Sequence, residues 1–158
     1  MKSTKKAITL FAIISLSFSN ISLAQEEHII ILYVNTAEIT NQNEYQVSYF
    51  DGQDEETDTR EFTIYVNPGD KIIWQGVSSN APETDVINIK SINYEGGKNV
   101  FGSNVLKGDG GDPQQVIGVV QNGTEGFEEK YKIAFTVYNN GRKRQGTFLI
   151  DPKIKVRQ

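Results

Sequence analysis

The sequence predicts an all-β protein, a Greek-key β-sandwich with about seven or eight strands. Three observations predict this fold class. Short apolar runs with strand-like alternation are separated by polar, glycine-containing turns. No segment shows the helical spacing of apolar residues over three turns. The one tryptophan, Trp74, follows a Pro-Gly-Asp turn at 68–70, and its large apolar side chain suits the middle of a sandwich.

The chain begins with the features of a secretory signal peptide, which we place at residues 1–24. Lysines within residues 2–6 precede an apolar run, and the small residues Ser22 and Ala24 come before the expected cut. The apolar run is short for a membrane span, which needs about 20 residues. We therefore expect residues 25–158 to form one exported domain, periplasmic or secreted, without a stable membrane anchor after cleavage.

Composition excludes several kinds of site. The chain has no cysteine, so no disulfide framework stabilises it. The only methionine, Met1, leaves with the leader, and His28 is the only histidine. The net charge of −4 becomes more negative once the basic leader is removed. An acidic chain argues against nucleic acid or anionic lipid as a partner, because both prefer a basic surface.

His28 stands at the start of the first apolar run, 28–34. Two roles for it are a metal ligand and a general base. One imidazole alone makes no site, however. We therefore expect His28 to be a surface histidine beside Glu26 and Glu27.

An acidic loop at 51–58 separates two alternating runs, 45–50 and 62–66. This pattern predicts a β-hairpin with the loop as its solvated tip. The alternative is a Ca²⁺ site with Asp51 and Asp54 among its ligands, since closely spaced carboxylates suit that ion. The loop lacks the ligand spacing of an EF-hand, which favours the hairpin tip.

The turn and the tryptophan, Pro68-Gly69-Asp70-Lys71-Ile72-Ile73-Trp74, resemble the start of cupredoxin-like domains. In these domains a Pro-Gly-Asp turn leads into a core strand. Proline and glycine suit the turn, and Asp70 can accept hydrogen bonds from nearby backbone amides. The resemblance implies a cupredoxin-like sandwich; an immunoglobulin-like one is the other sandwich that the strand pattern allows.

The copper chemistry of that family does not carry over. A type 1 copper site needs two histidines, a cysteine thiolate and usually a methionine, and the mature chain lacks this set. We expect no cofactor. The ending at 148–154 is also similar to the tail of small bacterial β-sandwich proteins of uncharacterised type, in fold and length only.

The middle of the chain holds the candidate contact residues. Residues 77–84 read as a loop, and 86–94 as a strand with a bulge near Lys90 and Ser91. Residues 95–115 are rich in glycine and irregular, as functional or mobile connections are. The residues we expect to contact a ligand or partner are Ser78, Ser79, Asn80, Lys107, Asp109 and Asp112. Asp109 and Asp112 are also candidate cation ligands, although a bare glycine-rich turn is the favoured interpretation.

The last third predicts a second hairpin. Residues 131–138 alternate cleanly, Asn139-Asn140-Gly141 is a strong turn signal, and 147–150 return antiparallel. Asp151-Pro152 is expected to bend the strand before Ile154 resumes it.

These features favour an exported, non-enzymatic module that binds a protein or a small ligand through its loops. No Gly-x-Ser-x-Gly elbow or cysteine nucleophile is present. One alternative is a structural subunit that assembles through its edge strands. The second alternative is a small hydrolase that uses two of the many carboxylates.

Overall fold

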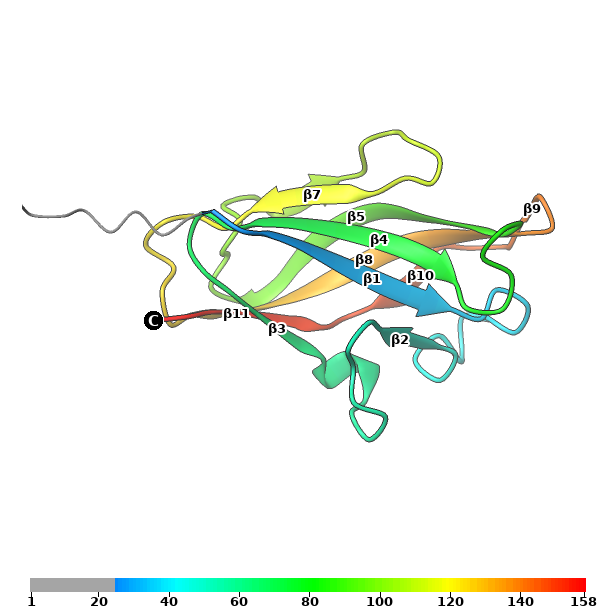
Figure 1. Cartoon of the computed structure of the whole chain (residues 1–158), viewed down its shortest axis with the longest axis horizontal. Coiled ribbons are helices and arrows are strands. Elements are labelled where there is room, and N and C mark those ends of the chain that lie inside the picture. The colour runs from blue at the N-terminus through cyan, green and yellow to red at the C-terminus, as the bar shows by residue number, and fades with distance from the viewer. Residues whose placement is uncertain (1–24) are drawn as a thin grey trace, which may run out of the picture.

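The computed structural model describes residues 25–158, whose regular structure is almost entirely β-strand (Figure 1). The expected signal peptide lies outside the described residues. Within them, one short 3-10 helix, η1, accompanies eleven strands. The all-β prediction is therefore confirmed. The elements are β1 (Glu27–Val34), β2 (Ser48–Phe50), η1 (Thr59–Glu61), β3 (Thr63–Val66), β4 (Lys71–Ser78), β5 (Val86–Gly97), β6 (Val105–Lys107), β7 (Val116–Val119), β8 (Glu128–Asn139), β9 (Arg142–Lys143), β10 (Phe148–Ile150) and β11 (Lys153–Val156).

The strands join one curled, mixed sheet with the shape of a half-barrel. Its main path runs β2-β1-β4-β5-β8-β11-β3, with β1–β4 and β11–β3 parallel. Off this path, β7 pairs with β4, β6 with β5, and β9 and β10 with β8. Figure 1 shows β7, β4 and β1 side by side, with β5 and β8 crossing behind them. The Greek-key sandwich order stays a prediction, since hydrogen bonds connect every strand into this one sheet.

β4 changes partner along its length, and this change forms a corner of the sheet. Residues 71–74 pair with β7, whereas Gly76 pairs with Ile87 of β5. A Cβ built at position 76 would lie 2.3 Å from Cγ2 of Ile87. The close approach of the two strands therefore requires glycine.

The core fills the inside of the curl. Trp74 is fully buried, its indole Nε1 donates to the hydroxyl of Tyr131 at 3.2 Å, and its ring packs edge-on against Phe101 and Tyr131. Ile72, two residues earlier, faces the same interior and is also buried. The prediction that Trp74 enters the core is confirmed.

The turn before β4 is fixed by its aspartate. Gly69 has a φ of 88°, which favours glycine. The buried carboxylate of Asp70 accepts from the amide of Asn67 at 2.7 Å and from the amide of Glu26 at 3.1 Å. The expected amide bonds to Asp70 are confirmed, and one of them ties the turn to the start of β1.

Three predictions about the later strands are confirmed. β8 pairs antiparallel with β9 and β10 around a tight turn, in which Asn140 and Gly141 have φ angles of 50° and 71°. The register of β5 shifts between Ile89 and Ser91, where the bulge was expected. Pro152 separates β10 from β11.

The predicted hairpin of 45–50 with 62–66 is wrong. β2 pairs with β1, whereas β3 pairs with β11, so these two strands lie at opposite ends of the sheet path. The curl brings the ends together, and Phe50 stacks on Phe62 at 4.4 Å between ring centroids. Alternation shows which face of a strand is buried, but it does not specify the partner strand.

Two smaller expectations, the start of a loop and the number of strands, also differ from the structure. β4 runs on through Ser78, so the loop expected at 77–84 begins later. The strand count exceeds seven or eight because β2, β6, β9 and β10 have only two or three residues each. Such short pairings depend on a neighbouring strand more than on their own sequence.

Candidate functional site

The outward side of β1, β4 and β7 carries an apolar row between the polar residues Lys71 and Gln75 of β4; we call it the outer face. Ile29, Ile73 and Ile117 occupy one row across these three strands, because Ile29 pairs with Ile73 and Ile73 with Ile117. Ile29 is 52% exposed, Ile117 41% and the neighbouring Val119 43%, whereas Ile73 between them is buried beneath its two neighbours and only 7% exposed. The alternating residues that point inward on the same strands are core residues. The sheet is therefore apolar on both sides here, which marks an interaction surface when the residues are contiguous.

The two ends of the outer face differ in chemistry. At one end, Lys71 donates to Glu27 at 2.8 Å. At the other end, Tyr33 of β1 stacks on the exposed Tyr49 of β2, with ring centroids 5.1 Å apart. The middle of the face thus carries no charge, while a charged pair and an aromatic pair flank it.

A groove between β2 and the loop that follows has a volume of about 590 Å³; we call it the loop groove. Tyr45 and Tyr49 line it together with the carboxylates of Asp54, Glu55 and Asp58. Acidic groups beside aromatic rings suit a cationic or sugar-like ligand. Ser48 also lines the groove, and its buried hydroxyl has no hydrogen-bond partner within the described part of the chain.

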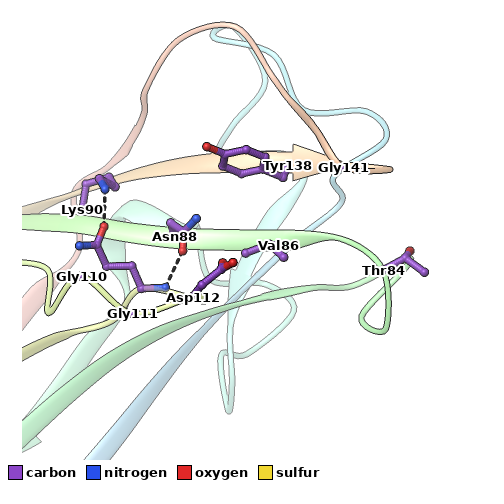
Figure 2. A pocket seen from close by; sticks show the side chains of 10 residues that line it. Thr84, Val86, Asn88, Lys90, Gly110, Gly111, Asp112, Tyr138 and Gly141 are labelled. Carbon is purple, nitrogen blue, oxygen red and sulfur yellow. Dashed lines mark hydrogen bonds between the residues drawn. The ribbon is translucent and has the colours of Figure 1, made fainter.

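A second groove, of about 430 Å³, lies over β5 and the glycine-rich loop (Figure 2). Asn88 and Lys90 of β5 line it, with Asp112 opposite and Tyr138 of β8 beside them. Gln114 hydrogen-bonds to both of these β5 side chains. Its backbone amide donates to Oδ1 of Asn88 at 2.5 Å, and its side-chain oxygen accepts from Lys90. These bonds fasten the loop to the strand.

The candidate contact residues Ser78 and Asn80 belong to a buried network around Asp85. Ser78 is buried and shares a hydrogen bond of 2.9 Å with Thr36, which also bonds Asn80 and Asp85. Burial by itself would raise the pKa of Asp85. The amide of Asn140 and the neighbouring hydroxyl and amide side chains donate to its carboxylate, and they hold its pKa below the usual value. This network joins the end of β4 to the start of β5.

The other predicted residues are dispersed over the surface. Ser79 and Lys107 are exposed on different strands or loops. Asp109 is exposed and accepts from the amides of Gly111 at 2.9 Å and Gln115 at 3.2 Å, which is the geometry of a self-contained turn. Of the acidic-loop candidates, Asp54 lines the loop groove and Asp51 is exposed outside it.

Sequence reasoning missed one cluster, in which Glu26, His28 and Asp70 meet. The Nε2 atom of His28 lies 2.9 Å from Oδ2 of Asp70 and 3.9 Å from Oε2 of Glu26. Asp70 is separated from His28 by more than forty positions, and only the parallel pairing of β1 with β4 makes them neighbours. The sequence carries no signal for that pairing.

A type 1 copper centre does not fit the described residues. Their one imidazole, His28, has two carboxylates for neighbours, whereas that centre needs a thiolate and a second imidazole. Among residues 25–158, no helix is long and apolar enough to cross a membrane.

Comparison with solved structures shows a likeness of fold. The crystal structure of the inclusion body protein PixA from Burkholderia cenocepacia J2315 superposes with a TM-score of 0.62 and 17% sequence identity, over 87% of this chain and 98% of that one. A copper-containing nitrite reductase from Thermus scotoductus SA-01 matches with a TM-score of 0.26 and 20% identity, over 80% of this chain and 30% of the reductase. The second value is too low to support an argument.

No family model matches the sequence, and no curated protein does. At 17% identity, the first likeness concerns the fold and not the activity. The chain thus shares its curled all-β fold with the PixA inclusion body protein.

Proposed function

We propose that this protein is an exported, non-enzymatic module that binds another protein through its outer face. The exposure of Ile29, Ile117 and Val119 on that face carries the proposal. Covering contiguous apolar surface stabilises a complex by about 25 cal/mol for each Å² removed from water. A partner that covers these side chains would therefore bind with a favourable hydrophobic contribution.

The arrangement of the outer face suits a protein partner. Interface centres are depleted of charge and enriched in aromatic residues, while charged residues occupy the rim. The row of isoleucines matches such a centre. The Glu27–Lys71 pair matches its rim, and the exposed ring of Tyr49 extends its centre.

The polar clusters also support a non-enzymatic role. The carboxylate of Asp85 is used by hydrogen bonds within the fold, and that of Asp109 by its own turn. A catalytic carboxylate needs a free lone pair or proton directed at a substrate. The hydrolase alternative would have to use the carboxylates of the loop groove, which face solvent.

The proposal includes the expectations about location and fold detail that came from the sequence. The leader at 1–24 would export the domain to the periplasm or the medium. Its fold would be a cupredoxin-like Greek-key sandwich without copper. PixA is named an inclusion body protein, which supports assembly with further copies as one form that the proposed binding takes.

The loop groove is a second candidate site, for a small ligand. The unpartnered hydroxyl of Ser48 and the carboxylates of Asp54 and Glu55 favour a ligand that carries both a positive charge and a hydrogen-bonding group. The third carboxylate, that of Asp58, is already paired with Arg60. A thermal-shift screen of amines, sugars and basic peptides tests it. A ligand whose effect survives Asp54→Asn with Glu55→Gln would not bind in this groove.

Site-specific photo-crosslinking in the producing cell tests the main proposal. A photoreactive amino acid replaces Ile117 in one variant and Leu149 in a control variant, since Leu149 is 39% exposed on β10, away from the outer face. We expect a discrete adduct from position 117 and none from position 149. The mass of the adduct identifies the partner as a second copy or a different protein. Equal labelling at both positions, or no adduct at either, would overturn the proposal.

A further inference from the structure

The Glu26–His28–Asp70 cluster brings together three donor groups of the kinds that bind transition metals. One nitrogen and two carboxylate oxygens, one from each residue, all lie within 4.8 Å of one another. Oε2 of Glu26 and Nε2 of His28 are 3.9 Å apart, and the distance from Nε2 to Oδ2 of Asp70 is 2.9 Å. The cluster lies at the N-terminal end of β1, and none of its three residues lines either groove.

The fold holds two of these donors in place. Asp70 is buried, and the amides of Asn67 and Glu26 fix its carboxylate. His28 is held by the parallel register of β1 and β4, in which it pairs with Ile72. Its side chain is 25% exposed, and that of Glu26 is 63% exposed. One side of the cluster is thus rigid and the other is open to solvent.

We propose that Glu26, His28 and Asp70 bind one divalent transition-metal ion, for which Zn²⁺ is the natural probe. Zn²⁺ binds nitrogen and carboxylate oxygen at about 2.0–2.2 Å in a tetrahedron, so its ligand atoms lie about 3.4 Å apart. The separations of 2.9 and 3.9 Å bracket that value. The exposed carboxylate of Glu26 moves at little cost, and solvent supplies the fourth ligand.

The state of the ligands also suits a cation. Burial by itself would raise the pKa of Asp70, but bonds from the amides of Asn67 and Glu26 and from His28 hold it below its usual value. Both oxygens of Asp70 accept backbone amides, so the carboxylate also acts as the acceptor in its contact with Nε2 of His28, where Nε2 carries the proton. A metal ion takes the place of that proton, and binding releases it.

This chemistry selects the metal. An imidazole nitrogen favours Zn²⁺ or Cu²⁺, whereas Ca²⁺ prefers six to eight oxygen ligands. The site is therefore chemically distinct from the acidic loop at 51–58, where Ca²⁺ would be the natural ion. The metal-binding proposal is tested on the protein alone, so its outcome does not depend on whether a partner binds the outer face.

His28 makes the test direct, because it is the only histidine of the chain. The mature chain is prepared without a histidine tag, and its single imidazole is followed by ¹⁵N NMR while ZnCl₂ is added. We expect the Nε2 resonance to shift with saturation, and CaCl₂ to leave it unchanged. Imidazole resonances that stay unchanged at millimolar Zn²⁺ would overturn the proposal.

Two variants define the ligand set, with affinity measured by calorimetry. Glu26→Gln removes an exposed ligand and preserves the fold, and we expect at least a tenfold loss of Zn²⁺ affinity. His28→Gln should abolish the binding, and Asp109→Asn, a distant carboxylate change, should not alter it. Wild-type affinity in Glu26→Gln would show that the ion binds elsewhere, as would loss of affinity in Asp109→Asn.

Discussion

Glu129 is a carboxylic acid within the core, and its burial makes the stability of the fold depend on pH. Its side chain is almost fully buried in β8, and Oε2 accepts from the amide of Val100 at 2.5 Å. Burial raises the pKa of Glu129 from its usual 4.5 to about 7, although that amide bond and one from Phe101 act in the opposite direction. The folded protein therefore keeps this proton at a pH where the unfolded chain has lost it.

We predict that the contribution of Glu129 to stability falls as pH rises from about 4.5 to about 7. Below this window both states are protonated, and above it both are ionised, so the contribution is constant on either side. The total change is on the order of 3 kcal/mol, since each pKa unit corresponds to about 1.4 kcal/mol. Urea denaturation of the wild type and of Glu129→Gln at several pH values checks this. The variant should lack this slope, and parallel profiles of the two proteins would contradict the prediction.

The corner between β4 and β5 decides the shape of the sheet at the scale of elements. β4 exchanges β7 for β5 as partner at Gly76, where the backbones approach so closely that a methyl group overlaps Ile87. By contrast, a Cβ at Gly96 of β5 would meet no atom within 4 Å. Close packing therefore requires glycine at position 76 of β4, whereas it does not at position 96 of β5.

We expect Gly76→Ala to lower the free energy of unfolding by about 1–3 kcal/mol, because it overpacks the corner. Gly96→Ala is the control and should be neutral or slightly stabilising, since it only restricts the unfolded chain. Thermal melts followed by near-UV circular dichroism measure both effects, and Trp74 reports on the core. Equal melting temperatures for the two variants would show that the corner tolerates a side chain.

At the scale of the whole molecule, the Asp85 network closes one end of the half-barrel. Asp85 accepts from Thr36 in the loop after β1 at 2.5 Å, from Asn139 at 2.6 Å and from the amide of Asn140 at 2.8 Å. Arg144 donates to the carbonyl of Thr36 and so adds the segment after β9. One buried carboxylate thereby joins parts of the chain that are far apart in sequence.

Asp85→Ala should cost about 2–4 kcal/mol of stability, since it leaves several buried donors without an acceptor. Asp109→Ala is the matched control, because Asp109 also accepts from two amides but in solvent, where water replaces it. Guanidinium denaturation at pH 7 measures both. The pKa of Asp85 is held below its usual value, so the difference from wild type should shrink as pH falls below about 4. A control variant as unstable as Asp85→Ala would contradict this account.

The local features of this protein were predictable from short stretches of sequence. Glycine and asparagine at 140–141 favour the positive φ angles of a tight hairpin, and the slip in alternation near Lys90 indicated the bulge. The burial of Trp74 followed from its size and from the turn before it. Each depends on conformational preference or on hydrophobic period, which neighbouring residues express by themselves.

The candidate sites depended on strand partners, which the sequence does not specify. Alternation predicted that Ile29 and Ile117 lie in strands, but only the pairing through Ile73 places them in one row. The same pairing of β1 with β4 brings His28 to Asp70 and changes an expected surface histidine into part of a cluster.

The sequence by itself thus determined the all-β class, the tight turns and the buried tryptophan. The tertiary structure alone decided which strands are neighbours and therefore which side chains meet. The physical reason is that backbone hydrogen bonds between strands are the same for every residue type. The choice of partner is made by the packing of the whole core around Trp74.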